Sequence, residues 1–122
     1  FKIVHPDMTL GEMLHDSVAK STRNIFPVVD VDHKFLGIIL LDDIREFMFD
    51  TKLYDTTKVE TFTHKAPDHI YYGLDSMQIV MQKFQDSGAW NLPVVKNGKY
   101  MGFVSKSKLL TAYRRELIKF TK

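Results

Sequence analysis

Residues 26–39 read FPVVDVDHKFLGII, and residues 92–104 repeat this stretch, with one residue deleted, as LPVVKNGKYMGFV. Each copy predicts a strand, a tight polar turn and a second strand, because a β-branched run follows the proline and an apolar run containing a glycine follows the turn. Asn97-Gly98 is the stronger turn signal, since both residues tolerate the positive φ angles of a type I′ turn. The sequence therefore predicts two β-hairpins of one kind.

The segments around each hairpin also repeat. Apolar side chains recur at the spacing of a helix face both before and after each hairpin. The four predicted helices cover residues 10–18, 42–48, 77–84 and 107–113. Thr9 precedes the first of them, and Asp75 or Ser76 precedes the third, so both have a capping-type residue. We interpret the methionine and phenylalanine stripes of these helices as core.

A short β-prone piece stands ahead of each copy, at residues 2–4 and 69–72. The repeating unit is therefore strand, helix, strand, strand, helix, which predicts a mixed α/β fold of the α+β type. We expect the first repeat in residues 1–50, a polar and threonine-rich connector in residues 51–65, and the second repeat in residues 66–122.

The composition fits a fold of this size. The chain has 122 residues, of which 44% are hydrophobic and 26% charged, enough for one compact domain and too few for a multi-domain machine. It contains no apolar run of about 18 residues, so no segment is predicted to cross a bilayer as a helix. The absence of cysteine excludes disulfides and thiolate zinc sites and fits a reducing, cytoplasmic location. Because the sequence begins at Phe1, we expect it to be excised from a longer polypeptide.

Charge is divided unequally along the chain. Residues 1–50 hold five basic and nine acidic residues, a charge of −4, and residues 51–122 hold twelve basic and six acidic residues, a charge of +6. This asymmetry suggests an anionic partner for the second half. One interpretation is nucleic-acid or membrane-surface binding through Lys106, Lys108, Arg114, Arg115, Lys119 and Lys122. The acidic first half and the lack of a recognition motif lead us to expect no nucleic acid.

Signatures of catalysis are absent from the sequence. The chain lacks the phosphate-binding, dinucleotide-binding, metalloprotease and nucleophile-elbow motifs, so no catalytic residues are predicted. His64 and His69 lie on either side of Pro67 without a third ligand nearby, and we therefore predict no metal site.

The two repeats resemble a tandem pair of CBS domains, the Bateman module, over essentially the whole chain. The resemblance is carried by the Pro-Val-Val hairpins, by Gly37 and Gly102 in their second strands, and by the closing helices, all in two copies and in order. It implies that the repeats pack through their sheets about a pseudo-two-fold axis, leaving two clefts that hold adenosine-type ligands in many members. It also implies a regulatory module without catalytic activity.

Within this family, three stretches look like the cytosolic C-terminal region of bacterial ClC-type chloride channels and antiporters. They are residues 21–30, 87–95 and 102–108. This resemblance implies a membrane transporter domain upstream of Phe1, a location at the cytosolic face of the cell membrane, and a homodimer formed through the CBS helices. A CBS pair of a different transporter or enzyme is the alternative.

The ligand motif of the family, Ser/Thr-x-x-Asp at the start of the closing helix, is incomplete in both copies. The first copy has Asp43 but Leu40 at the hydroxyl position, and the second has Ser105 but Lys108 at the aspartate position. In the family the aspartate accepts hydrogen bonds from the ribose hydroxyls, and the helix start faces phosphate. Lys108 is either a solvated lysine or a point charge for phosphate.

The resemblance therefore implies an adenosine-type site beside Asp43, with apolar walls for the purine, and AMP, ADP, ATP or S-adenosylmethionine as the regulatory ligand. Tyr71 is either a stacking surface for adenine or an ordinary packing residue. The candidate ligand-binding residues are Asp43, Ile3, Val4, Ile25, Phe26, Pro27, Ser105, Lys108 and Tyr71.

The incomplete motifs leave a second function open. In this alternative the chain is an assembly module that holds a dimeric host together and binds no small molecule. The dimer contacts would come from the outer helices, through Phe47, Met48, Phe49 and Tyr113.

Overall fold

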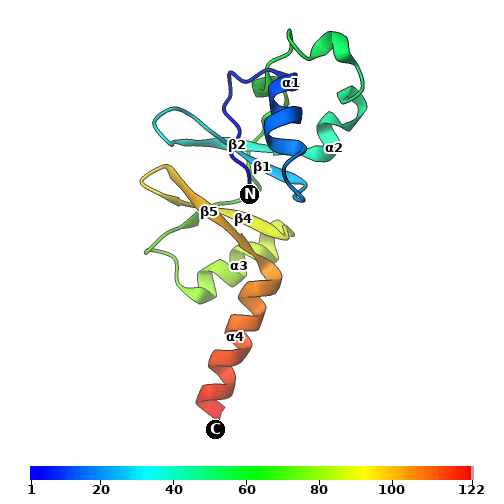
Figure 1. The fold of residues 1–122 in the computed structure, drawn as a ribbon. Helices are drawn as coiled ribbons and strands as arrows, with labels where there is room; N and C mark the ends of the chain where they lie inside the picture. The colour runs from blue at the N-terminus through cyan, green and yellow to red at the C-terminus, as the bar shows by residue number, and fades with distance from the viewer. Residues whose placement is uncertain (122) are drawn as a thin grey trace. The chain divides into compact units, whose positions relative to one another are not determined.

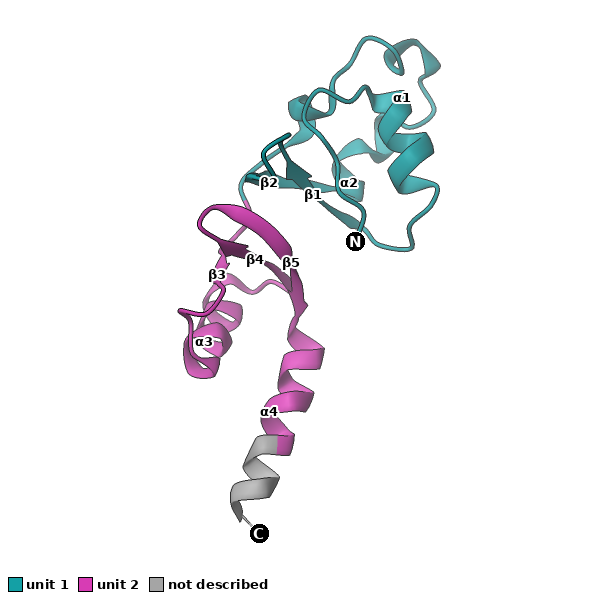
Figure 2. Ribbon diagram, turned by 60° about the vertical axis from the view of Figure 1, so that its left-hand side comes forward, with its two compact units in different colours: residues 1–65 teal, residues 66–122 magenta. Residues whose placement is uncertain are grey.

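The computed structural model describes residues 1–121, with side chains described through residue 115. The chain divides into two compact units, residues 1–65 and 66–122, and Figure 2 colours them separately. Figure 1 labels the helices and strands of both units. Among the described residues, no helix combines the length and the apolar character needed to cross a membrane.

The first unit follows the predicted order of elements. Its elements are α1 (Leu10–Met13), a π-helical turn (Leu14–Val18), β1 (Ile25–Val29), β2 (Phe35–Leu40), α2 (Leu41–Ile44) and a 3₁₀ turn (Arg45–Phe47). Thr9 is the N-cap of α1, as predicted, and forms a capping box with Glu12. Both predicted helices are present, although each changes from α to another helical geometry after one turn.

Strands β1 and β2 pair antiparallel, with Phe26 opposite Ile39 and Val28 opposite Gly37. The predicted strand at residues 2–4 is reduced to a single parallel bridge between Val4 and Val28. Val4 is nevertheless fully buried. Two main-chain hydrogen bonds hold it beside β1, because its amide donates to the Pro27 carbonyl and its carbonyl accepts from the Val29 amide, both at 2.9 Å. The core of this unit is formed by Val4, Met13, Phe26, Val28, Ile39, Ile44 and Val59.

Residues 51–65, expected as a connector, pack with the first unit. They form two 3₁₀ turns, Thr51–Leu53 and Val59–Phe62. Val59 is fully buried in the core, and Phe62 packs against it. His64 then pairs with Ile38 of β2, with the two amide-to-carbonyl distances at 2.8 and 3.0 Å. This segment therefore adds a residue to the core of the first unit and pairs with the free edge of β2.

The second unit repeats the same order more regularly. Its elements are β3 (Ile70–Tyr71), α3 (Met77–Ser87), β4 (Asn91–Lys96), β5 (Lys99–Ser105) and α4 (Lys106–Thr121). β3 pairs parallel with β4, and β4 pairs antiparallel with β5. Ile70, Val80, Phe84 and Leu92 form the core, so α3 packs on the sheet, with Leu109 of α4 against the same cluster. The predicted fold class, an α+β chain of two such repeats, is confirmed.

Local signals in the second unit decide where its elements turn and begin. Asn97 and Gly98 have φ angles of 53° and 79°, as the predicted type I′ turn requires. Ser76, and not Asp75, is the N-cap of α3. α4 begins one residue before Ser107, because the Ser105 hydroxyl accepts the amide of Lys108 at 3.2 Å and so caps the helix.

Candidate functional site

Asp43 lies in the single turn of α2 and is held by a histidine that is distant in the sequence. Its Oδ2 lies 2.9 Å from Nε2 of His64, and the two side chains are 45% and 46% exposed. The His64 main chain is fixed by its pairing with Ile38. Leu40, at the N-cap position of α2, supplies no side-chain cap. A ribose diol that reached Asp43 would therefore share the carboxylate with an imidazole.

The five apolar candidates of the first unit differ in how much surface they offer. Val4, Phe26 and Pro27 are buried, while Ile3 and Ile25 are half-buried. The buried three contribute to the core that supports the site, and only the half-buried pair has surface for a purine.

In the second unit a polar and aromatic cluster surrounds the start of α4. We call it the α4-start cluster, and it consists of Trp90, Asn91, Ser105, Lys106 and Lys108. β4 and β5 bring it together, because Asn91 stands opposite Ser105 in the sheet. The Lys106 amide donates to the Trp90 carbonyl at 2.9 Å. These contacts join the first residues of β4 to the first turn of a 16-residue helix.

Three members of this cluster have side chains that solvent reaches: Trp90 and Lys108 are exposed, and Lys106 is half-buried. Trp90 is 70% exposed, and the Lys106 ammonium lies 5.2 Å from the centroid of its ring. Lys108 is exposed in the first turn of α4. Cationic side chains and a helix N-terminus together give this surface a positive potential that favours an anion.

Asn91 adds a buried acceptor to the same cluster. Its Oδ1 is shielded from solvent and has no hydrogen-bond partner. A buried acceptor without a donor costs about 1–3 kcal/mol, so a bound molecule that donates an N–H or O–H there would recover this energy. Sequence reasoning missed this unpaired acceptor, because the shielding of Oδ1 depends on burial in the folded chain.

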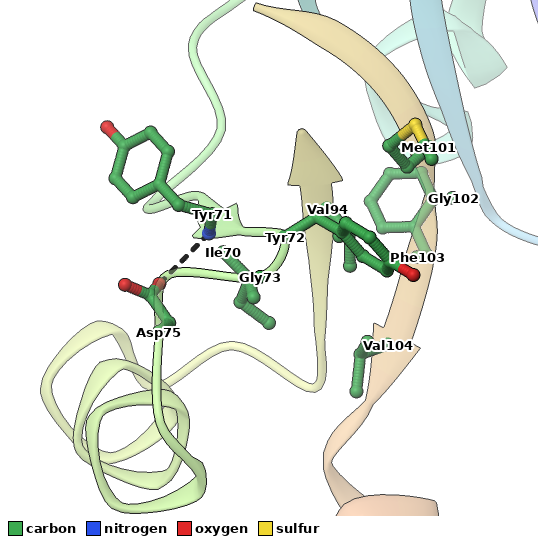
Figure 3. A pocket seen from close by; sticks show the side chains of 10 residues that line it. All are labelled: Ile70, Tyr71, Tyr72, Gly73, Asp75, Val94, Met101, Gly102, Phe103 and Val104. Carbon is green, nitrogen blue, oxygen red and sulfur yellow. Dashed lines mark hydrogen bonds between the residues drawn. The ribbon is translucent and has the colours of Figure 1, made fainter. Parts of the chain in front are cut away.

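Tyr71 lies in a different part of the second unit, beside a buried ion pair. Its amide donates to Asp75 Oδ2 at 2.9 Å, as Figure 3 shows, and the Lys83 ammonium lies 4.4 Å from its ring centroid. Lys83 also donates to Asp75 Oδ2 and to the His69 carbonyl, both at 2.7 Å. Burial by itself would raise the pKa of Asp75, but Lys83 and the Tyr71 amide outweigh it and hold that pKa below 3.8.

A pocket of about 400 Å³ opens beside Tyr71. It is lined by Ile70, Tyr71, Tyr72, Gly73, Asp75, Val94, Met101, Gly102, Phe103 and Val104, all of the second unit. Figure 3 shows these side chains along β3, β4 and β5 and in the loop that follows β3. Apart from Asp75, whose Oδ2 is already bonded, the lining side chains are aliphatic or aromatic.

The remaining predicted residues are distributed over both units. Arg114 and Arg115 are exposed on α4, whereas Lys119 and Lys122 lie outside the residues whose side chains are described. Of the proposed dimer contacts, Phe49 is 87% exposed. Phe47 packs against Phe62, with ring centroids 5.4 Å apart. Within the described part of the chain, no three His, Cys, Asp or Glu side chains are grouped as metal ligands.

Comparison with known protein families identifies the family of this chain. The model of the CBS domain family matches residues 1–50 and again residues 65–115. None of the curated proteins matches the sequence.

The solved structures that are similar to most of this chain include three with a bound nucleotide. CbpB in complex with c-di-AMP is 19% identical, with a TM-score of 0.75, and the match covers 98% of this chain and 80% of that one. CBSX2 in complex with AMP is 18% identical, with a TM-score of 0.72 and coverages of 94% and 88%. The CBS domain of a bacterial CNNM/CorC family Mg²⁺ transporter in complex with ATP is 17% identical, with a TM-score of 0.70 and coverages of 90% and 75%. At these identities the similarity shows the fold.

Proposed function

The chain belongs to the CBS domain family, as a tandem pair of CBS domains, and on this basis we propose that it is a non-catalytic regulatory module that senses an adenine nucleotide. The observation that carries the proposal is the orphan Oδ1 of Asn91 within the α4-start cluster. The structures of CbpB, CBSX2 and the CNNM/CorC domain, each with a different adenine nucleotide, support the choice of ligand.

An adenine nucleotide matches the α4-start cluster group by group. Its exocyclic amine or a ribose hydroxyl would donate to Asn91 Oδ1, and its base would stack on the exposed Trp90 ring. The phosphates would be held by the Lys106 and Lys108 ammoniums rather than by the amides of those two residues, which already donate to Trp90 and Ser105.

The positive charge of the α4-start cluster predicts the order of affinity of the candidate ligands. AMP, ADP and ATP carry increasing negative charge toward a surface with two lysines at a helix start, so affinity should increase in that order. S-adenosylmethionine carries a sulfonium cation and no phosphate, and we place it last. Regulation requires that the ligand bind one arrangement of the host better than another.

Asp43 is the centre of a second candidate site, which lies within the first unit, and its carboxylate would accept hydrogen bonds from the ribose. Its carboxylate is half-exposed and has one oxygen bonded to His64. Ile3 and Ile25 supply the only predicted wall residues with exposed surface in the first unit. We propose Asp43 as a ribose acceptor whose orientation is set by His64.

The host that we propose is a membrane chloride channel or antiporter of the ClC type. The stretches at residues 21–30, 87–95 and 102–108 support this choice, and the CNNM/CorC domain is a case of a CBS pair in a transporter. The chain would then lie at the cytosolic face of the membrane, downstream of the transporter domain. The alternative host is another transporter or an enzyme.

Assembly of a dimeric host is the second candidate function, and Phe49 favours it. Phe49 follows the 3₁₀ turn after α2 and is 87% exposed, so its ring is available to a partner. We therefore propose a homodimer through these helices. Light scattering of the chain and of Phe49→Ser would test it, because a monomer at high concentration in both would contradict the dimer.

Calorimetry with AMP, ADP, ATP and S-adenosylmethionine tests the sensor. Asn91→Leu should remove nucleotide binding at the α4-start cluster while leaving the fold at least as stable, because it removes the orphan acceptor. Lys108→Met should weaken ATP more than AMP, and Lys99→Met, on the hairpin turn, is the matched control. The proposal of a nucleotide sensor is wrong if no nucleotide binds at millimolar concentration to the folded chain.

A further inference from the structure

The two units treat one equivalent position differently. Gly37 stands opposite Val28, and Gly102 stands opposite Val94, at matching places in the two hairpins. A Cβ atom on Gly37 would lie 2.5 Å from the carbonyl oxygen of His64. A Cβ atom on Gly102 would have no atom within 4 Å. Polypeptide therefore fills the space beside the first glycine, and the space beside the second is open.

The segment that fills this space in the first unit is well anchored. We call residues 57–64 the cover segment. Its Val59 is fully buried, and its amide donates to the Met8 carbonyl at 2.9 Å. Phe62 packs against the same core, and His64 pairs with Ile38. Two apolar side chains and main-chain hydrogen bonds thus hold this cover along the free edge of β2.

The 400 Å³ pocket lies beside Gly102, the matching glycine of the second unit. Ile70, Val94 and Gly102 are neighbours across β3, β4 and β5 and line the pocket together with Val104. Ile70, Val94 and Val104 also belong to or pack against the core cluster, so the pocket continues the core of the unit outward. Tyr72 and Met101, at 55% and 51% exposed, form its rim (Figure 3).

We propose that this pocket binds a polypeptide segment with the chemistry of the cover segment, in which two apolar anchors are spaced as Val-x-x-Phe. A peptide is favoured over a small molecule because, at the equivalent place in this same chain, main chain lies directly against the glycine. The Lys96 ammonium lies 5.6 Å from the Tyr72 ring and makes the rim positive. An acidic residue beside the first anchor, as Glu60 follows Val59, complements it.

This site is separate from the proposed nucleotide site. None of the residues of the α4-start cluster lines the pocket. Peptide binding would remove the Tyr72 and Met101 side chains from water, in addition to filling apolar space that continues the core. An experiment can therefore contradict peptide binding by the pocket without contradicting nucleotide binding by the α4-start cluster, and the reverse.

A peptide of residues 57–65, TKVETFTHK, is the probe, added to the whole chain and followed by amide NMR. We expect saturable shifts at residues 101–104 and at 70–73. A control peptide with both anchors, Val59 and Phe62, replaced by serine should produce none. Met101→Lys should weaken the affinity by about tenfold or more, equivalent to about 1.4 kcal/mol. Ile79→Lys, on exposed α3 surface of the same unit, should not.

Four results would overturn the proposal. They are no shift at millimolar peptide, equal binding of the serine peptide, shifts at Gly37 in place of Gly102, and concentration-dependent shifts at residues 101–104 without peptide. The last result would assign the pocket to a second copy of the chain. The NMR spectra of both lysine variants report whether they remain folded. A titration with ATP, read at Asn91 and Lys108, tests the sensor separately.

Discussion

The ammonium of Lys83 lies 2.7 Å from the carboxylate of Asp75, and the two side chains are only 18% and 10% exposed. The pair joins α3 to the loop after β3. The same ammonium also bonds the His69 carbonyl and lies over the Tyr71 ring. One lysine therefore fixes the wall of the pocket, and its removal leaves a largely buried carboxylate with the Tyr71 amide but without its cationic partner.

Lys83→Met should accordingly destabilise the second unit. Removing one partner of a buried pair costs about 3 kcal/mol, part of which methionine recovers through packing. Urea unfolding followed by circular dichroism measures the loss. Gln85→Met, on exposed α3 surface, is the matched control and should change stability by less than about 0.5 kcal/mol. Equal effects of the two substitutions would show that the pair contributes nothing.

The Asp75 pair also predicts a dependence of stability on pH. Because the folded-state pKa of Asp75 is lowered below 3.8, its contribution is present above pH 3.8 and is lost as the pH falls through the folded value. Other carboxylates titrate in the same range, so the difference between the wild type and Asp75→Asn is the quantity to measure. This difference should be constant from neutral pH down to 3.8 and should shrink below it. A difference that grows on acidification contradicts the assignment.

If Asp43 reads the ribose, the chain should distinguish AMP from 2′-deoxy-AMP. A hydrogen bond to a charged acceptor is worth about 1.5–3 kcal/mol, so the preference should be at least about tenfold. Asp43→Ala should abolish the preference. Asp42→Ala should retain it, because Asp42 is the neighbouring carboxylate and is paired with Arg45 at 3.0 Å. Calorimetry gives all the affinities, and a preference that survives Asp43→Ala would remove Asp43 from the site.

Ser105 should matter for stability as the N-cap of α4. Ser105→Ala removes the acceptor of the Lys108 amide and should cost about 1 kcal/mol. Ser105→Asp should restore the loss, since aspartate is an equally good cap. Ser107→Ala, two residues further along the chain, should leave the stability nearly unchanged in the same thermal unfolding experiment. If Ser107→Ala costs more than Ser105→Ala, the helix start is misplaced.

Val59 should behave as a core residue of the first unit. Its side chain is fully buried. Val59→Ala should therefore lower the free energy of unfolding by about 2 kcal/mol, because it removes buried apolar surface and leaves a cavity. Thr61→Ala, at an exposed position of the same 3₁₀ turn, should be close to neutral. Chemical unfolding of both variants decides the question, and equal stabilities would mean that the segment does not contribute to the core.

The sequence predicted those parts of the fold that have local signals. Pro-Val-Val, Asn97-Gly98 and the capping residue Thr9 each specify a backbone conformation within a few residues, and each element is present. The packing of residues 51–65 was not predicted, because Val59 and Phe62 are isolated among threonines and charged residues and form no periodic pattern.

The candidate site was less accessible to sequence reasoning. The bond between Asp43 and His64 joins residues 21 apart, and no spacing rule relates them. The unpaired Oδ1 of Asn91 arises from burial, which only the assembled sheet produces. The positions of Ser105 and Lys108 were predicted from the repeat, but the fourth helix was expected to begin at residue 107, so the capping role of Ser105 was not predicted.

The burial of Val59 separates the unit of duplication from the unit of folding. A gene fragment cut where the repeated pattern ends, at residue 50, would encode a complete copy of the repeat and still lack a residue of its own core. Expression boundaries and domain grafts for the first copy should therefore run to residue 65, where the compact unit ends. The second copy needs no such extension, because the buried residues of its core, Ile70, Val80, Phe84 and Leu92, all lie within its own repeat.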